Sequence, residues 1–375
     1  MTVGKARPKD NRRLSSPYYL HGEDLFLRRN GREVFVKKVS SAAGWIPEKG
    51  AVILAPGIAC NGNLFRVTSD GECLTFDHAT SFANLLASAG YQVYLWHYSS
   101  SQRIMERYVS RFCQESQRYD VKGYRVPSSL GFDQLMSDEM PMVLDLVCQN
   151  SGREEVAWIG FSMGGMLAYA YLACQADKRI DKLITIGSPV SFSTRLPKLI
   201  SHANRISSTL GIKDRTVGAR ISERFVLLSG MLKYAPKKLL RLDPLVGFLY
   251  NPGNVSDGAL ESFFSKIVEP IPAGQEKSFS HFIRNGFSAV DGRDNYLDGM
   301  RRIRERRINS LFFYGQEDQL AVSSSVMLAH EIISPENRRN LVEVKGAGHN
   351  DLVIGLGSAE DVWGPSLEWL EERGK

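Results

Sequence analysis

The sequence is poor in cysteine, and the few cysteines it has lie at irregular spacings. There are five among 375 residues, an odd number, and none forms the C-x-x-C or Cys/His spacing of a zinc site. Neither a disulfide framework nor a structural metal is predicted. We therefore expect a reducing, cytoplasmic setting and a protein that needs no metal or cofactor.

Long hydrophobic runs are also missing. No segment reaches the ~18 consecutive apolar residues that suggest a membrane-spanning helix. The basic N-terminal residues 1–13 are not followed by the apolar stretch of a secretory signal. The hydrophobic content of 43% is instead spread over the chain, which is long enough to bury a large core. One large domain with an insertion, or two domains, would fit this length.

Charge is modest overall and unevenly placed. The formal net charge is +6, yet residues 191–310 alone carry 20 Lys and Arg against 11 Asp and Glu. Such a segment could rest on an anionic lipid surface, or its cations could simply be solvated. We expect no nucleic-acid partner.

The sequence around Ser162 predicts a strand, a sharp turn and a helix. The apolar run Val156–Phe161 precedes the serine, glycines stand at 160 and 164, and helix-forming residues follow to Cys174. A serine held in a strained strand-to-helix turn needs neighbours without side chains, and it would face the free N–H groups of the helix. This pattern is typical of a nucleophile elbow, although a Gly-Ser turn without chemistry would look similar.

The rest of the chain alternates between apolar strands and helices, which predicts an α/β fold with a mostly parallel, doubly wound sheet. Two apolar runs around Asn30-Gly31 predict an antiparallel hairpin at its start. The other expected strands are 51–57, 91–96, 182–188, 308–315 and 341–344, and the expected helices are 80–90, 136–147, 323–333 and 361–372.

Two side chains that could activate Ser162 follow later strands. A serine hydroxyl needs a base, and a histidine base needs an acid to orient it. Asp318 follows the strand 308–315, and His349 follows the strand 341–344 on a glycine-rich loop. Because the carboxyl ends of parallel strands meet at one edge, we expect Ser162, His349 and Asp318 to form a catalytic triad. Glu317 is the alternative acid.

The oxyanion of such a reaction would be held by backbone N–H groups. The expected donors are those of Met163, after the nucleophile, and Ile58, after the strand 51–57, with Ala59 as an alternative to Ile58. Cys60 is interpreted as a small buried residue without a role. Among the other histidines only His97, at a strand end, is expected near the site.

Three stretches resemble a known superfamily. These are Gly160-Phe-Ser-Met-Gly-Gly165, the residues Phe132-Asp133 with Glu139 and Pro141, and His349-Asn-Asp-Leu-Val-Ile-Gly355. The chain resembles the α/β-hydrolases, and within them the acid lipases and the polyhydroxyalkanoate synthase-like hydrolases. That resemblance implies a serine hydrolase with a cap. Synthases use a cysteine nucleophile, so Ser162 argues against polymerisation, and Asp351 is interpreted as a loop-structural residue.

These observations divide the chain into an arm, a core and an insertion. We expect a loose arm over 1–20, an α/β-hydrolase core over 21–188 and 308–375, and a helical cap over 189–307 above a hydrophobic acyl pocket. The expected function is hydrolysis of a carboxylic ester, an esterase or lipase-like activity. An acyltransferase with the same triad and a non-catalytic ligand-binding protein are the alternatives.

Overall fold

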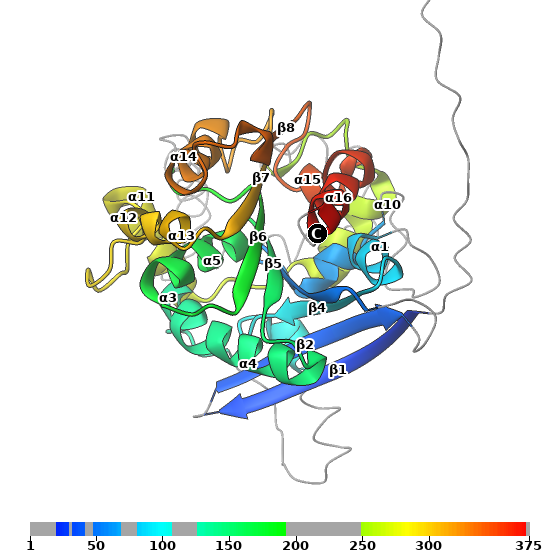
Figure 1. Ribbon diagram of the computed structural model, residues 1–375, viewed down its shortest axis with the longest axis horizontal. Coiled ribbons are helices and arrows are strands. Elements are labelled where there is room, and N and C mark those ends of the chain that lie inside the picture. The colour runs from blue at the N-terminus through cyan, green and yellow to red at the C-terminus, as the bar shows by residue number, and fades with distance from the viewer. Residues whose placement is uncertain are drawn as a thin grey trace, which may run out of the picture.

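An eight-stranded, mostly parallel sheet forms the centre of the molecule (Figure 1). The computed structural model describes residues 20–29, 32–41, 48–68, 81–106, 126–192 and 249–372. The predicted arm 1–20 lies outside these residues apart from Leu20, as do the hairpin turn 30–31 and residues 193–248 of the predicted insertion.

The strands follow the order β1-β2-β4-β3-β5-β6-β7-β8 across the sheet. β1 pairs with β2 and β2 with β4 in antiparallel fashion, and every later pair is parallel. The predicted hairpin and α/β class are therefore confirmed. The strands are β1 Leu20–Arg29, β2 Arg32–Ser41, β3 Gly50–Ala55, β4 Tyr91–His97, β5 Val156–Phe161, β6 Ile180–Ile186, β7 Asn309–Gly315 and β8 Leu341–Val344.

Helices cover both faces of the sheet because its central strands are apolar on both sides. Along β3, Val52 and Leu54 face one hydrophobic cluster while Ala51 and Ile53 face the other. The first cluster is covered by η1 Gly62–Arg66, α1 Phe82–Ser88, α15 Asp351–Ile354, η5 Ala359–Trp363 and α16 Gly364–Glu372. The second is covered by α3 Phe132–Gln134, η2 Leu135–Glu139, α4 Met140–Ser151, α5 Met163–Cys174 and α14 Ser323–Ile333. The short turn η4 Arg338–Asn340 leads into β8.

The part of the predicted insertion that the structure describes, residues 249–307, is mainly helical and packs on both sides of the sheet. Its elements are α10 Asp257–Ser262, η3 Phe263–Ile267, α11 Ala273–Asn285, α12 Tyr296–Gly299 and α13 Arg301–Glu305. In Figure 1, α10 lies beside α1 and α16, whereas α11, α12 and α13 lie on the side of α5. The division of the chain into a core and a separate cap stays a prediction.

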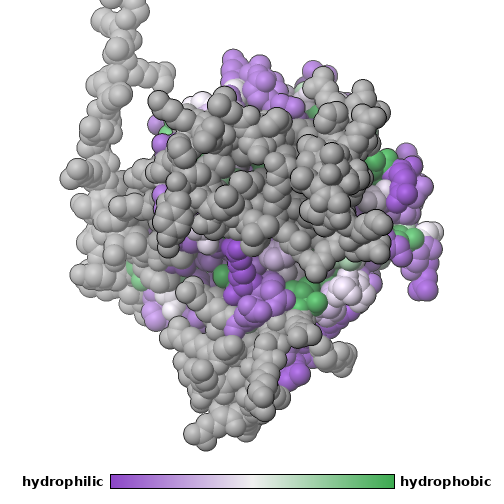
Figure 2. All heavy atoms as spheres, turned by 180° about the vertical axis from the view of Figure 1, so that it is seen from behind, coloured by the Kyte–Doolittle hydropathy of each residue, from purple (hydrophilic) through white to green (hydrophobic). Residues whose placement is uncertain are grey.

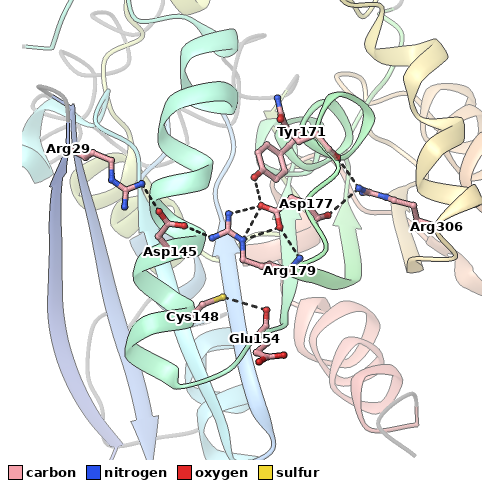
Figure 3. Close-up of polar contacts among 9 residues, drawn as sticks. Arg29, Asp145, Cys148, Glu154, Tyr171, Asp177, Arg179 and Arg306 are labelled. Atoms are coloured by element: carbon pink, nitrogen blue, oxygen red, sulfur yellow. Dashed lines mark hydrogen bonds and ion pairs between the residues drawn. The ribbon is translucent and has the colours of Figure 1, made fainter.

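A polar network joins β1, α4, α5 and the segment that leads into β6 (Figure 3). Asp145 on α4 pairs with Arg29 of β1 and with Arg179, which precedes β6, at 2.5 Å each. Arg179 also binds Asp177 at 2.6 Å, and the Tyr171 hydroxyl donates to the same carboxylate. These charge-assisted bonds hold the pKa of Asp177 down at about 2. These bonds tie α4 to β1 and to the segment before β6, which indicates a structural role.

The described surface carries little exposed hydrophobic area. Leu356 is the one large hydrophobic side chain that is exposed in the described part of the chain. Seen from behind, the coloured surface is mainly hydrophilic with small separate hydrophobic areas (Figure 2). None of the described helices is long and apolar enough to cross a membrane. Much of the basic segment 191–310 for which lipid contact was considered, residues 193–248, lies outside the described residues, so that contact remains a prediction.

Candidate active site

Ser162 occupies the turn between β5 and α5 in a strained conformation. Its φ of 52° and ψ of −117° are unusual for a residue with a side chain. A Cβ on Gly160 would lie 2.3 Å from the nitrogen of Gly165, and one on Gly164 would lie 2.1 Å from the carbonyl oxygen of Ala55. Both positions therefore require glycine. The strand-turn-helix that the sequence predicted is confirmed.

His349 bridges the hydroxyl of Ser162 and the carboxylate of Asp318. Its Nε2 lies 2.9 Å from Ser162 Oγ, and its Nδ1 lies 2.7 Å from Asp318 Oδ2. All three residues are buried. The structure thus brings together the three side chains selected from the sequence.

Asp318 is fixed by its own loop. Its Oδ1 accepts the N–H groups of Leu320 and Ala321, both at 2.8 Å, which leaves Oδ2 for the histidine. The alternative acid, Glu317, has an exposed side chain, and none of the hydrogen bonds among the described residues joins its carboxylate to His349. The geometry favours Asp318 as the partner of His349.

The loop that carries His349 is held by Asp351. Oδ2 of Asp351 accepts the N–H of Gly348 at 2.9 Å, the N–H of Asn251 at 3.1 Å and the side-chain amide of Asn254 at 3.2 Å. Burial raises the pKa of Asp351 to about 6, against these hydrogen bonds, which lower it. Among the described residues, these hydrogen bonds of Asp351 reach backbone and amide groups rather than Ser162 or His349, in keeping with the loop-structural role expected for it.

The loop after β3 lies directly against the elbow. A Cβ on Gly57 would be 3.2 Å from Ser162 Cβ, which places the backbone of Ile58 beside the serine. Met163 begins α5, where the first N–H groups of a helix have no partner within the helix. Ala59, in the same loop, has a φ of 56° and is a second strained residue. The N–H groups of Ile58 and Met163 remain the predicted oxyanion donors.

The sequence drew attention to two further residues of this region, His97 beside the loop and Cys60 within it. His97 is fully buried, and its Nδ1 accepts the N–H of Gly62 at 3.3 Å. Burial, with Lys37 and Arg66 nearby, lowers its pKa well below the usual value, so the ring is neutral. Cys60 is buried too, and burial raises the pKa of its thiol. A protonated thiol is unreactive, which agrees with the interpretation of Cys60 as a residue without a role.

The residues of the Phe132-Asp133 and Glu139 stretch act as ties between segments. Asp133 accepts the hydroxyl of Tyr296 at 2.8 Å and the N–H of Val290 at 2.9 Å, and so joins residues 290–296 to the core. Glu139 is fully buried and accepts the N–H and the hydroxyl of Ser99. Burial raises the pKa of Glu139 to about 7.

The sequence did not single out Tyr98 and Glu269, which also support the loop after β3. The Tyr98 hydroxyl donates to the carbonyl of Pro56 at 2.5 Å. Glu269 is buried beside Asn61. Glu269 is the single acid in the apolar stretch Ile267-Val-Glu-Pro-Ile-Pro272, and this pattern could have indicated a buried carboxylate from the sequence. Among the described residues, no cluster of three or more His, Cys, Asp and Glu side chains could hold a metal ion.

Comparison with known proteins identifies the class to which this fold and site belong. The family model of the alpha/beta hydrolase fold matches residues 50–356. The chain therefore belongs to the α/β-hydrolase family. A pimeloyl-[acyl-carrier protein] methyl ester esterase of Vibrio campbellii is 34% identical over 61 residues, which is 16% of this chain and 23% of that protein. The matched segment thus spans about a quarter of this relative.

Solved structures of esterases and lipases share the fold. A lipase in its open form aligns with a TM-score of 0.56 at 17% identity, over 95% of this chain and all of the other. A carboxylesterase of Nitrososphaera gargenis aligns with a TM-score of 0.54 at 14% identity, over 93% of this chain and all of the other. The esterase of Exiguobacterium antarcticum aligns with a TM-score of 0.50 at 16% identity, over 92% and 98% of the two chains. These similarities establish the fold.

Proposed function

We propose that this α/β-hydrolase is a serine hydrolase that cleaves carboxylic esters through an acyl-enzyme. The observation that carries the proposal is the continuous hydrogen-bond chain from Ser162 through His349 to Asp318. The esterase named for the Vibrio relative and the esterases and lipases among the structural neighbours support the same reaction class.

In the first half-reaction, Ser162 Oγ attacks the acyl carbon of the ester while its proton passes to His349 Nε2. Asp318 holds the ring so that Nδ1 donates to its carboxylate, and it stabilises the imidazolium that forms. The carbonyl oxygen becomes an anion, for which the N–H groups of Met163 and Ile58 are the proposed donors. Collapse of this intermediate transfers the proton from His349 to the leaving alkoxide and releases the alcohol.

In the second half-reaction, water takes the place of the alcohol. His349 removes a proton from the water as the oxygen attacks the acyl carbon, and it returns that proton to Ser162 Oγ when the acid leaves. An acyltransferase would differ in one respect, since another alcohol or a thiol would attack the same acyl-enzyme. The predicted preference for a hydrophobic acyl group rests on apolar blocks such as 225–232, which lie outside the described residues.

Labelling with a fluorophosphonate probe tests the proposed nucleophile. We expect the wild type to react with the probe and to hydrolyse p-nitrophenyl esters, and Ser162→Ala to do neither while keeping its unfolding temperature. Loss of the hydroxyl removes no core packing. Retained labelling or hydrolysis in a clean Ser162→Ala preparation would disprove the assignment, and a wild type that never labels would favour the non-catalytic alternative.

A labelled acyl donor separates hydrolysis from acyl transfer. With p-nitrophenyl esters of increasing chain length, we expect free acid as the main product in water, and a better specificity constant for longer acyl groups. If added alcohols captured most of the label at low concentration, acyl transfer would be the better description.

A further inference from the structure

The loop from Gly57 to Asn61, which carries the proposed oxyanion donor Ile58, is anchored at three points by two other segments. Tyr98 binds the carbonyl of Pro56 on one side of the loop, and His97 accepts the N–H of Gly62 on the other. Both belong to β4 or to the residue that follows it. The third anchor, residues 267–269, comes from the predicted insertion.

Residues 267–269 pair with this loop as a short antiparallel ladder. Cys60 and Val268 form the bridge. The N–H of Asn61 donates to the carbonyl of Ile267 at 3.1 Å, and the N–H of Glu269 donates to the carbonyl of Ala59 at 2.8 Å. The strained residue Ala59 is therefore held from the insertion side, which matters because an exposed turn of this kind would relax.

The carboxylate of Glu269 completes the connection. Its Oε1 accepts the side-chain amide of Asn61 at 2.9 Å, and its Oε2 accepts the N–H of Arg103 at 3.0 Å. Asn61 in turn accepts the N–H of Asn63 at 3.0 Å through its Oδ1 and donates to the carbonyl of Lys266 at 3.0 Å. One carboxylate thus joins the loop after β3 to the turn after β4.

Glu269 is almost completely buried, with 2% of its surface exposed. Burial raises its pKa to about 7, although these hydrogen bonds and the charge of Arg103 lower it. Keeping an acid in such a place is unfavourable unless its oxygens are bonded. A Leu or Met would pack there at less cost, so the hydrogen bonds explain why an acid stands at this position.

We propose that Glu269 is a positioning residue that holds the loop 57–61, and with it the N–H of Ile58, against Ser162. The inference rests on the proposed function, because it assigns Glu269 to the oxyanion site of that reaction. The insertion would then support the oxyanion loop of the active site, in addition to any role as a cap over the acyl pocket. If the oxyanion donor is misplaced, the transition state is stabilised less, whereas binding of the ester in its ground state changes little.

Variants of the pair Glu269 and Asn61 test the proposal, assayed at about pH 8.5, where a carboxyl with a pKa near 7 is ionised. Glu269→Gln leaves one acceptor oxygen for two donors, so its NH2 must face either the Asn61 amide or the N–H of Arg103 and one of the two bonds is lost. We expect kcat to fall on the order of tenfold to a hundredfold, with KM within about threefold. Asn61→Asp sets two carboxylates against each other and should cause a similar fall. In the double variant the amide at position 269 can donate to the carboxylate at position 61, which removes the repulsion between two carboxylates. Because that carboxylate cannot donate to the carbonyl of Lys266, we expect kcat to recover above that of Asn61→Asp and to stay below that of the wild type.

A trifluoromethyl ketone gives a second readout. Ser162 adds to its carbonyl, and the resulting oxyanion occupies the proposed hole, so Glu269→Gln should weaken this inhibitor by about the same factor as kcat. Gln275→Ala is the matched control, since Gln275 is also buried and its amide bonds to Ser100 at 2.9 Å instead of the loop. We expect that control to keep kcat. If Glu269→Gln does not fold, Asn61→Ala removes the same bond from the other side.

Amide hydrogen exchange of residues 58–61 distinguishes failure of this inference from failure of the proposed function. Faster exchange in Glu269→Gln than in the wild type is expected whether or not the protein hydrolyses esters. A wild type without labelling or activity, but with that difference in exchange, would overturn only the proposed function. Unchanged exchange, unchanged kcat in Glu269→Gln, or a double variant no better than Asn61→Asp would overturn the positioning role.

Discussion

His349 Nε2 lies 2.9 Å from Ser162 Oγ, although 187 positions separate the two residues in the chain. The parallel sheet accounts for the contact. Ser162 follows β5 and His349 follows β8, and the carboxyl ends of parallel strands open at the same edge. Asp318 follows β7, between them. The three residues lie far apart in the sequence, so the triad geometry depends on the sheet being intact. The loops after β7 and β8 are also joined directly, since the N–H of Glu317 donates to the carbonyl of Ala347 at 2.9 Å.

Asp318→Asn should reduce turnover sharply and leave the fold unchanged. Asparagine can take the same space, but its amide can set the neighbouring histidine in the wrong tautomer, so that Nε2 can no longer accept the serine proton. We expect kcat for a p-nitrophenyl ester to fall by a factor on the order of 10⁴. Steady-state kinetics together with an unfolding curve would measure both effects.

Glu317→Gln is the matched control for that change, since Glu317 is the adjacent acid and its side chain is exposed. Its kcat should stay within about twofold of the wild type, because an exposed carboxylate away from the ring has little influence on the transition state. A large loss in Glu317→Gln with a small loss in Asp318→Asn would move the acid role to Glu317.

Gly164→Ala should destabilise the elbow. The added Cβ would lie 2.1 Å from the carbonyl oxygen of Ala55 and 2.8 Å from that of Pro56, and both are backbone atoms that cannot turn away. We expect the free energy of unfolding to fall by about 2 kcal/mol or more, or the protein to become insoluble. Chemical denaturation monitored by tryptophan fluorescence would measure it.

Gly253→Ala is the control, since its nearest neighbour would be a side-chain oxygen of Asn251 at 3.5 Å. We expect a change within about 0.5 kcal/mol there. Equal stability of the two variants would show that the contact between α5 and the end of β3 is looser than the structure has it.

Much of the fold and of the candidate site could be predicted from the sequence, because their signals are local. Asn30-Gly31 between apolar runs, the glycines around Ser162, and Asp318 and His349 just past apolar strands each describe one short segment. Parallel pairing then brings the strand ends together, so the triad could be predicted without knowing how the side chains pack.

The contacts that support the site could not be predicted in the same way. Glu269 and Asn61 are 208 positions apart, and nothing in either neighbourhood specifies the other. The same holds for Asp351 and Asn251, 100 positions apart. Such pairs depend on how residues 249–307 divide between the two faces of the sheet, and an amphipathic pattern indicates a buried face without naming its partner.

As the pH rises, the free energy of unfolding of Glu139→Gln should increase relative to that of the wild type. Gln can keep both bonds to Ser99, because its carbonyl oxygen accepts the N–H while the serine hydroxyl can reverse its direction. The wild-type carboxyl has a pKa of about 7 in the folded protein and an ordinary value of 4.5 when unfolded. The folded state therefore binds more protons between these values, and the contribution of Glu139 to stability falls as pH rises through that window.

The difference in unfolding free energy between the two proteins should change over the pH range between these two pKa values. Urea unfolding of wild type and Glu139→Gln at matched values from about pH 4 to pH 8 measures it, and the shift corresponds to about 3 kcal/mol in total. Because the difference is taken at each pH, other groups cancel, including His97, whose lowered pKa acts in the opposite direction. Arg32 and Asp138, the charged neighbours that act on Glu139, remain in both proteins. A difference that is flat over this range would mean that Glu139 is ionised in the folded protein with an ordinary pKa, and that water reaches its carboxylate.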